Sequence, residues 1–148
     1  MAAPTALVTG IGGQDGAYLA RHLRCLGVRV VGTVEPGGLP PGYAAAYLPD
    51  VELVEHDVRD APGFARLLES WSPGQVYNLA AFSSVGASFD HRELVEQTNA
   101  EAVRRMLERL WSTGTGTARR RGSFRRRARR CSRATPLSRG PSRAPRRR

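Results

Sequence analysis

Short runs rich in apolar residues alternate, along the first 112 residues, with longer stretches in which apolar residues recur every three or four positions. The runs at residues 6–8, 28–34, 51–55 and 76–79 have the length of buried strands. The stretches at residues 15–26, 64–71 and 93–111 have the period of amphipathic helices. Strands separated by helices of this length form parallel sheets with helical crossovers. The pattern therefore predicts the α/β fold class.

A glycine-rich turn joins the first predicted strand to the first predicted helix. Gly10 follows the strand, and Gly13 and Gly16 flank the start of the helical pattern. In a dinucleotide site such glycines permit a tight turn, close approach of a pyrophosphate and close packing of the helix, whose N-terminus attracts phosphates. We therefore predict a truncated Rossmann-type parallel sheet. Its cofactor-binding turn comprises Gly10, Ile11, Gly12, Gly13, Gln14, Asp15 and Gly16.

Further candidate site residues follow the other strands, at the edge where parallel sheets bind ligands. Glu35 lies 19 residues beyond Gly16, where a carboxylate meets the adenosine ribose and repels a 2′-phosphate. Asp57 and Val58 are expected at the adenine, although Asp57 or Asp60 could instead cap the next helix. Small residues after the fourth strand either admit a cofactor or simply pack tightly. The predicted cofactor contacts there are Leu79, Ala80, Ala81, Phe82 and Ser83.

The distribution of charge divides the chain into two parts. Residues 1–112 hold all 13 acidic residues and nine of the 23 basic residues, an excess of four negative charges. Residues 113–148 hold the other 14 basic residues, and every basic residue of the chain is arginine. High charge and low hydrophobicity prevent a packed core. We therefore predict a partial NAD(P)-binding domain over residues 1–112 and a disordered Arg-rich tail over residues 113–148.

The chain shows no sign of a membrane or metal site. No apolar run approaches the ~18 residues of a membrane-spanning helix, so we expect a cytoplasmic protein with no membrane partner. Cys25 and Cys131 have no spacing typical of a metal or redox site, and Cys25 follows an apolar helical pattern that predicts its burial.

Two segments carry a family resemblance. Residues 6–19 read Ala-Leu-Val-Thr-Gly-Ile-Gly-Gly-Gln-Asp-Gly-Ala-Tyr-Leu, and residues 76–89 read Val-Tyr-Asn-Leu-Ala-Ala-Phe-Ser-Ser-Val-Gly-Ala-Ser-Phe. Both resemble the GDP-mannose 4,6-dehydratases, a family of extended short-chain dehydrogenases/reductases. Gly12 and Ala17 depart slightly from its opening motif, and Ser83-Ser84 stand where Ser-His is common. The resemblance covers residues 5 to about 110, the first third of such an enzyme.

The resemblance implies a reaction and a cofactor. An intact member oxidises the C4 hydroxyl of GDP-mannose, eliminates water across C5–C6 and returns the hydride to C6, giving GDP-4-keto-6-deoxymannose. NADP is the cofactor implied, whereas Glu35-Pro36 here replace the two arginines that hold its 2′-phosphate, so Glu35 favours NAD. The resemblance also implies that Ser84 contacts substrate beside Ser83, unless both serines are ordinary loop residues. Only an intact homologue is expected to bind the GDP-sugar.

The catalytic residues of such enzymes have no counterpart in this sequence. The family's base is the Tyr of a Tyr-x-x-x-Lys motif, but the chain has no Lys, and its tyrosines stand at 18, 43, 47 and 77. The Ser/Thr and Glu that follow the family's fifth strand are also missing. We predict no catalytic residue and an inactive, dinucleotide-binding, N-terminal fragment. The alternatives are a fragment of another nucleotide-sugar epimerase or dehydratase, or a basic-tailed nucleic-acid-binding protein.

Two hypotheses account for the tail. A basic arm would bind nucleic acid or another polyanion non-specifically and in a salt-dependent way. Alternatively, the reading frame has shifted near residues 114–119. Residues 125–132 can be back-translated so that another frame encodes Ala-Ser-Ser-Ala-Glu-Met-Phe, which resembles the family's fifth-strand segment. The coding DNA distinguishes the two, because a shifted frame would contain a downstream Tyr-x-x-x-Lys motif.

Overall fold

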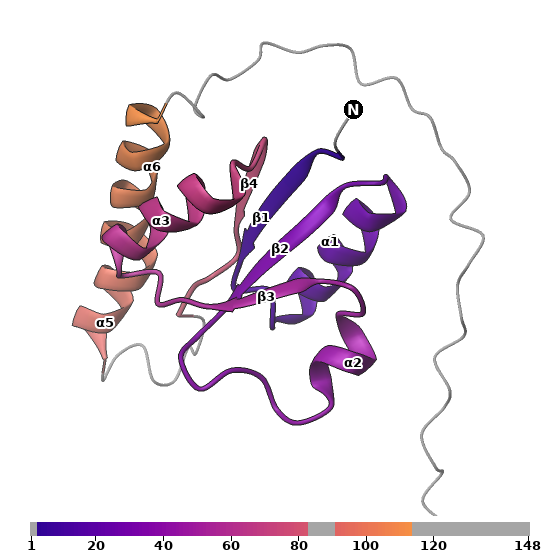
Figure 1. Cartoon of the computed structure of the whole chain (residues 1–148). Helices are drawn as coiled ribbons and strands as arrows, with labels where there is room; N and C mark the ends of the chain where they lie inside the picture. Colours follow the sequence, from indigo (N-terminus) through magenta and orange to yellow (C-terminus); the bar gives the residue numbers. More distant parts are fainter. Residues whose placement is uncertain (1–2, 83–90, 114–148) are drawn as a thin grey trace, which may run out of the picture.

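The computed structural model describes residues 3–82 and 91–113 (Figure 1). One parallel sheet with the order β3-β2-β1-β4 runs through its centre. Its strands are β1 (Thr5–Thr9), β2 (Arg29–Val34), β3 (Glu52–Glu55) and β4 (Gln75–Asn78). The helices are α1 (Gln14–Cys25), α2 (Tyr43–Tyr47), α3 (Ala61–Trp71), α5 (Arg92–Glu96), the π-helical turn η1 (Gln97–Glu101) and α6 (Ala102–Ser112). The predicted parallel α/β fold is confirmed.

Alternate residues of the central strands pack against helices on opposite faces of the sheet. Ala6 and Val8 of β1 belong to a cluster on the α1 face, whereas Leu7 between them belongs to a second cluster with α3 and α6. Figure 1 shows α1 and α2 on one side of the sheet and α3 and α6 on the other. Because both faces of the sheet are covered, β1 and β2 are almost wholly buried, as is typical of parallel strands.

Local sequence signals place the helix ends. Gly27 follows α1 with a φ of 78°, a left-handed conformation that suits glycine. Asp60 caps α3, because its carboxylate accepts a hydrogen bond from the Gly63 N–H at 3.0 Å. This settles the role left open for Asp60 in the sequence. Pro62 occupies the first turn of α3, where no N–H partner is needed.

The structure differs from the sequence-based expectations at three places. The short helix α2 was not predicted, because residues 43–47 form little more than one turn. The predicted helix over 93–111 is one helical rod interrupted by η1. Cys25 is exposed at the end of α1, so the prediction of its burial is wrong. Cys25 follows Arg24 and does not lie on the helix face that carries the buried Ala20 and Leu23.

Two predictions concern residues that the structure does not describe. Ser83 and Ser84 lie outside the described residues, as does the tail beyond Thr113. Within residues 3–82 and 91–113, no helix is both long enough and apolar enough to cross a membrane.

Leu7 provides a test of the α3–α6 core. Leu7 lies on β1, and its side chain is fully buried within that cluster. We expect Leu7→Ala to lower the free energy of unfolding by about 2–5 kcal/mol, because the loss of apolar burial is compounded by a cavity. Urea unfolding of the full chain measures the change. Leu26→Ala is the matched control, since Leu26 is 57% exposed, and a similar loss in both variants would contradict the packing.

Candidate dinucleotide site

The turn between β1 and α1 depends on the missing side chain of Gly10. Gly10 has a φ of 66°, and a Cβ atom there would lie 2.6 Å from the backbone N and Cα atoms of Ala80. Both the conformation and the lack of space therefore require glycine. The close approach also brings Ala80, just beyond β4, to the same edge of the sheet as the turn. Gly10 thus performs the role predicted for the first glycine.

Ile11 holds the glycine-rich turn in place through its buried side chain. Its side chain is fully buried, and Cβ atoms added to Gly16 or Gly32 would come within 2.6 Å of Ile11 atoms. The Ile11 N–H donates to the Thr33 carbonyl at 3.1 Å, so that donor is already used within the protein. Ile11 was predicted to contact cofactor, and the structure gives its side chain a structural position. Gly16 does allow close packing, although its neighbour is Ile11 rather than a residue of β1.

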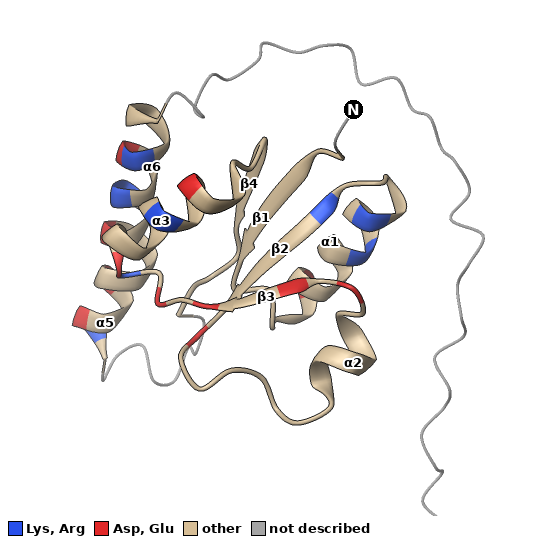
Figure 2. Ribbon diagram, in the orientation of Figure 1, with Lys and Arg blue, Asp and Glu red and all other residues tan. Residues whose placement is uncertain are grey.

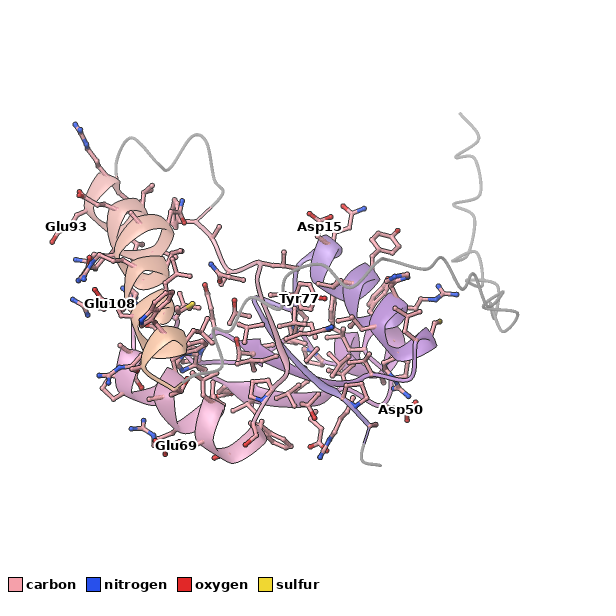
Figure 3. The ribbon with its side chains drawn as sticks, turned by 90° about the horizontal axis from the view of Figure 1, so that it is seen from above. Asp15, Asp50, Glu69, Tyr77, Glu93 and Glu108 are labelled. Carbon is pink, nitrogen blue, oxygen red and sulfur yellow. The ribbon has the colours of Figure 1, made fainter. Side chains whose placement is uncertain are left out.

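The exposed part of the turn is formed by Gly13, Gln14 and Asp15. A Cβ atom at Gly13 would meet only the Gly10 carbonyl oxygen, at 3.6 Å, so the space in front of it is open. Gly13 is also the N-cap of α1 and has no side chain to pair with the first N–H groups of the helix. In Figure 3 the labelled Asp15 projects away from the sheet beside this end of α1.

The neighbouring Gly12 is covered by the loop that follows β2. A Cβ atom at Gly12 would lie 2.5 Å from Leu39 Cδ2, the end of a side chain that packs on the α1 cluster. The long loop over residues 36–42 therefore contacts the glycine-rich turn at Gly12, whereas Gly13 is exposed.

Hydrogen bonds join the carboxyl ends of β1 and β4. The buried Thr9 hydroxyl donates to Asn78 Oδ1 at 2.5 Å, and the Leu79 N–H donates to the Thr9 carbonyl at 3.1 Å. These bonds hold residues 79–81 beside the glycine-rich turn. Leu79 is 39% exposed and Ala81 is exposed, so both are available to a ligand.

Asn99 is a structural residue that the sequence reasoning missed. Its side-chain amide accepts a hydrogen bond from the Phe82 N–H at 2.8 Å and donates to the Phe82 carbonyl at 3.1 Å. Asn99 lies in η1, where the wider helical turn interrupts the α-helix. The amide pair thus holds the chain leaving β4 against the helical rod. A possible signal was the run Gln97-Thr98-Asn99, which contains two poor helix formers within an otherwise helical pattern.

Charged residues follow β2 and β3. Glu35 is exposed directly after β2, and its carbonyl accepts from the Gly38 N–H at 2.9 Å in a turn. The Asp57 carboxylate accepts from the Arg59 N–H at 2.9 Å, from Arg59 Nε at 3.0 and 3.1 Å, and from Arg59 Nη2 at 2.5 Å. The hydrogen bonds from Arg59 lower the pKa of Asp57, which keeps it ionised. Val58 packs partly buried against the α3–α6 cluster.

His56, which directly follows β3, is an unusual buried histidine. His56 is 7% exposed, and its Nε2 is buried without a hydrogen-bond partner in the described part of the chain. Its backbone N–H donates to the Val34 carbonyl at 2.8 Å, and its ring stacks 6.3 Å from that of Phe64. Burial lowers the pKa of His56 in opposition to the carboxylates of Asp60 and Asp57, while Arg66 lowers it further. The folded chain therefore favours the neutral imidazole.

The predicted residues thus gather along the carboxyl edge of the sheet. The Gly13 turn and residues 79–82 lie beside β1 and β4, and Glu35 and Asp57 follow β2 and β3. Figure 2 shows acidic positions along β3 and in the loops that leave β2 and β3. Among the residues described, no three His, Cys, Asp or Glu side chains form a group that could hold a metal ion.

Comparison with known proteins identifies the family. The model of the family "GDP-mannose 4,6 dehydratase" matches residues 7–121, more than half of the chain. The chain belongs to the GDP-mannose 4,6-dehydratase family. It is 32% identical over 113 residues to the GDP-mannose 4,6-dehydratase of Vibrio cholerae, covering 71% of this chain and 30% of that protein. It is 33% identical over 119 residues to GDP-mannose 4,6 dehydratase 1 of Arabidopsis thaliana, covering 72% and 32%.

The GDP-mannose 4,6-dehydratase relatives are longer than this chain, which spans about a third of their length. Solved structures of related fold include UDP-glucose 4-epimerase from Brucella ovis in complex with NAD, with a TM-score of 0.66 and 23% identity over 76% of this chain and 34% of that chain. The UDP-glucose 4-epimerase complex with NAD from Thermus thermophilus has a TM-score of 0.66 and 24% identity over 75% and 35%. These likenesses confirm the Rossmann-type fold.

The buried His56 predicts how stability depends on pH. Because its pKa is below 6.5 in the folded chain, protonation favours the unfolded chain. We expect the free energy of unfolding to fall as pH is lowered from about 6.5 through the folded-state pKa of His56. Urea unfolding of the full chain at several pH values measures this. His56→Gln, whose side chain does not titrate, should lose this pH dependence, and an unchanged slope would contradict the assignment.

Proposed function

We propose that this chain binds a nicotinamide dinucleotide along the carboxyl edge of its sheet. The observation that carries the proposal is the open space in front of Gly13, at the N-terminus of α1, where a Cβ atom would have one neighbour, at 3.6 Å. A pyrophosphate placed there would meet unpaired backbone N–H groups and the positive end of the helix dipole. Two structures of the same fold contain NAD, which makes this the ligand class to test first.

The other site residues receive the remaining parts of the dinucleotide. We infer that Glu35 meets the adenosine ribose, where its carboxylate accepts from ribose hydroxyls and favours NAD over NADP. Asp57 and Val58 would lie at the adenine. The carboxylate of Asp57 is engaged by Arg59, but it offers about four lone-pair positions, so it can still accept from an amino group. Residues 79–84 would lie along the nicotinamide, with Ser83 toward the cofactor and Ser84 toward a sugar nucleotide.

We infer that this chain by itself does not dehydrate GDP-mannose. Its 148 residues contain no Lys, and therefore no Tyr-x-x-x-Lys motif. In short-chain dehydrogenases/reductases the Lys lowers the pKa of the Tyr that serves as general base. We therefore propose dehydration of GDP-mannose and binding of a GDP-sugar only for proteins that also contain the two thirds of the relatives' length that this chain does not span.

Substitution of Gly13 tests the dinucleotide site. Gly13 has φ −75° and ψ 166°, which any residue adopts, so Gly13→Val should fold normally while its side chain fills the pyrophosphate position. We expect calorimetric titration to show NAD binding to the full chain, and a loss of more than about tenfold in affinity for Gly13→Val. The same samples, given GDP-mannose, should form no 4-keto sugar.

Gly74→Val is the matched control for this experiment. Gly74 precedes β4 at the opposite edge of the sheet, and a Cβ atom there would have its nearest neighbour, the Thr5 carbonyl oxygen, at 4.0 Å. This variant should bind NAD like the parent chain. Equal affinity of Gly13→Val and the parent would remove Gly13 from the binding site, and circular dichroism would verify that both variants are folded.

We infer from charge alone that residues 113–148 bind polyanions without sequence preference. Their 14 arginines can neutralise phosphates, and release of counterions then makes binding depend steeply on salt. Affinity of the full chain for random-sequence DNA should fall by about 10³-fold or more between about 50 and 200 mM salt. Filter binding over a salt series measures this. Discrimination among DNA sequences that persists at about 150 mM salt would instead support a selected nucleic-acid-binding arm.

A further inference from the structure

The 2′ position of the adenosine ribose distinguishes NAD from NADP, and its neighbours in this chain follow if the proposed dinucleotide site is correct. In parallel sheets of this kind, a carboxylate after the second strand favours the ribose hydroxyls of NAD, whereas a nearby arginine accommodates the 2′-phosphate of NADP. Pro36 and Gly37 follow Glu35, so the segment after β2 offers no arginine. The loop that follows the next strand, β3, contains an arginine, Arg59.

The register of the sheet places residues 35 and 57 side by side. Val34 of β2 is paired with Glu55 of β3, and the His56 N–H donates to the Val34 carbonyl at 2.8 Å. Glu35 and Asp57 therefore leave neighbouring strands at the same level of the carboxyl edge. Asp57 holds the guanidinium of Arg59 through Nε and Nη2, at distances from 2.5 to 3.1 Å. Asp57 thus determines where the charge of Arg59 lies.

Arg59 has room and hydrogen-bonding capacity for a further anion. Its side chain is 45% exposed, and within the described residues its Nη1 makes no hydrogen bond. The pKa of Arg59 is raised, first by its hydrogen bonds to Asp57 and also by the negative charge of Glu35.

These positions give the 2′-group two neighbours of opposite charge. A 2′-phosphate carries nearly two negative charges, which Glu35 repels and which a guanidinium attracts through paired N–H donors. We propose that Arg59, held by Asp57 beside Glu35, is the specificity-determining residue that allows this chain to accept the 2′-phosphate of NADP in addition to the ribose hydroxyls of NAD. The preference for NAD expected from Glu35 is therefore small in the parent chain.

Calorimetric titration of the full chain with NAD and with NADP tests this assignment. Arg59→Gln should weaken NADP binding about tenfold or more, because a charged hydrogen bond is lost, and should change NAD binding much less. Arg59→Lys, which keeps the charge without the fork, should fall between the parent and Arg59→Gln. Glu35→Gln should act in the opposite direction and strengthen NADP binding relative to NAD.

Arg66→Gln is the matched control. Arg66 is also exposed and paired with an aspartate of the same loop, Asp60 at 3.5 Å, but it lies on α3 outside the proposed site. It should leave the NAD-to-NADP ratio unchanged. An unchanged ratio in Arg59→Gln overturns the role of Arg59 while leaving dinucleotide binding intact. Failure of the parent chain to bind either dinucleotide overturns the proposed function and this inference together.

Discussion

The close packing of backbone around Ile11 is the constraint on which the rest of this structure depends. Cβ atoms at Gly16 and Gly32 would overlap Ile11, and one at Gly10 would overlap the backbone of Ala80. Without side chains at these positions, α1, β2 and the end of β4 can all approach the same turn. The interior then closes around a fully buried Ile11, because close-packed protein cores have no room for an additional methyl group.

This packing separates buried from exposed residues within a single motif. Gly10, Ile11 and Gly16 hold the turn from inside, whereas Gly13, Gln14 and Asp15 face outward. Among the described residues, the N-terminus of α1 is exposed at Gly13, Gln14 and Asp15. On the other side Leu39 covers Gly12, so the loop after β2 forms part of the surface around the turn.

The two halves of the carboxyl edge are held by different interactions. Beside β1 and β4, uncharged hydrogen bonds connect Thr9 to Asn78 and Phe82 to Asn99. Beside β2 and β3, the main interaction is the ion pair between Asp57 and Arg59, which remains partly exposed. An exposed ion pair contributes little to stability. In the proposed dinucleotide site, its role is to hold the Arg59 guanidinium in one orientation.

The sequence by itself determined the fold class, the positions of the four strands and the glycine-rich turn, because apolar periodicity and glycine conformations act over short distances. It also offered Asp60 as one of two candidate caps of α3. Only the tertiary structure decided that Ile11 is buried, that Asn99 holds Phe82 from 17 residues away, and that Glu35 and Asp57 leave neighbouring strands at the same level. These contacts join residues far apart in the chain, and they depend on which strands become neighbours, which local patterns of apolar and polar residues do not specify.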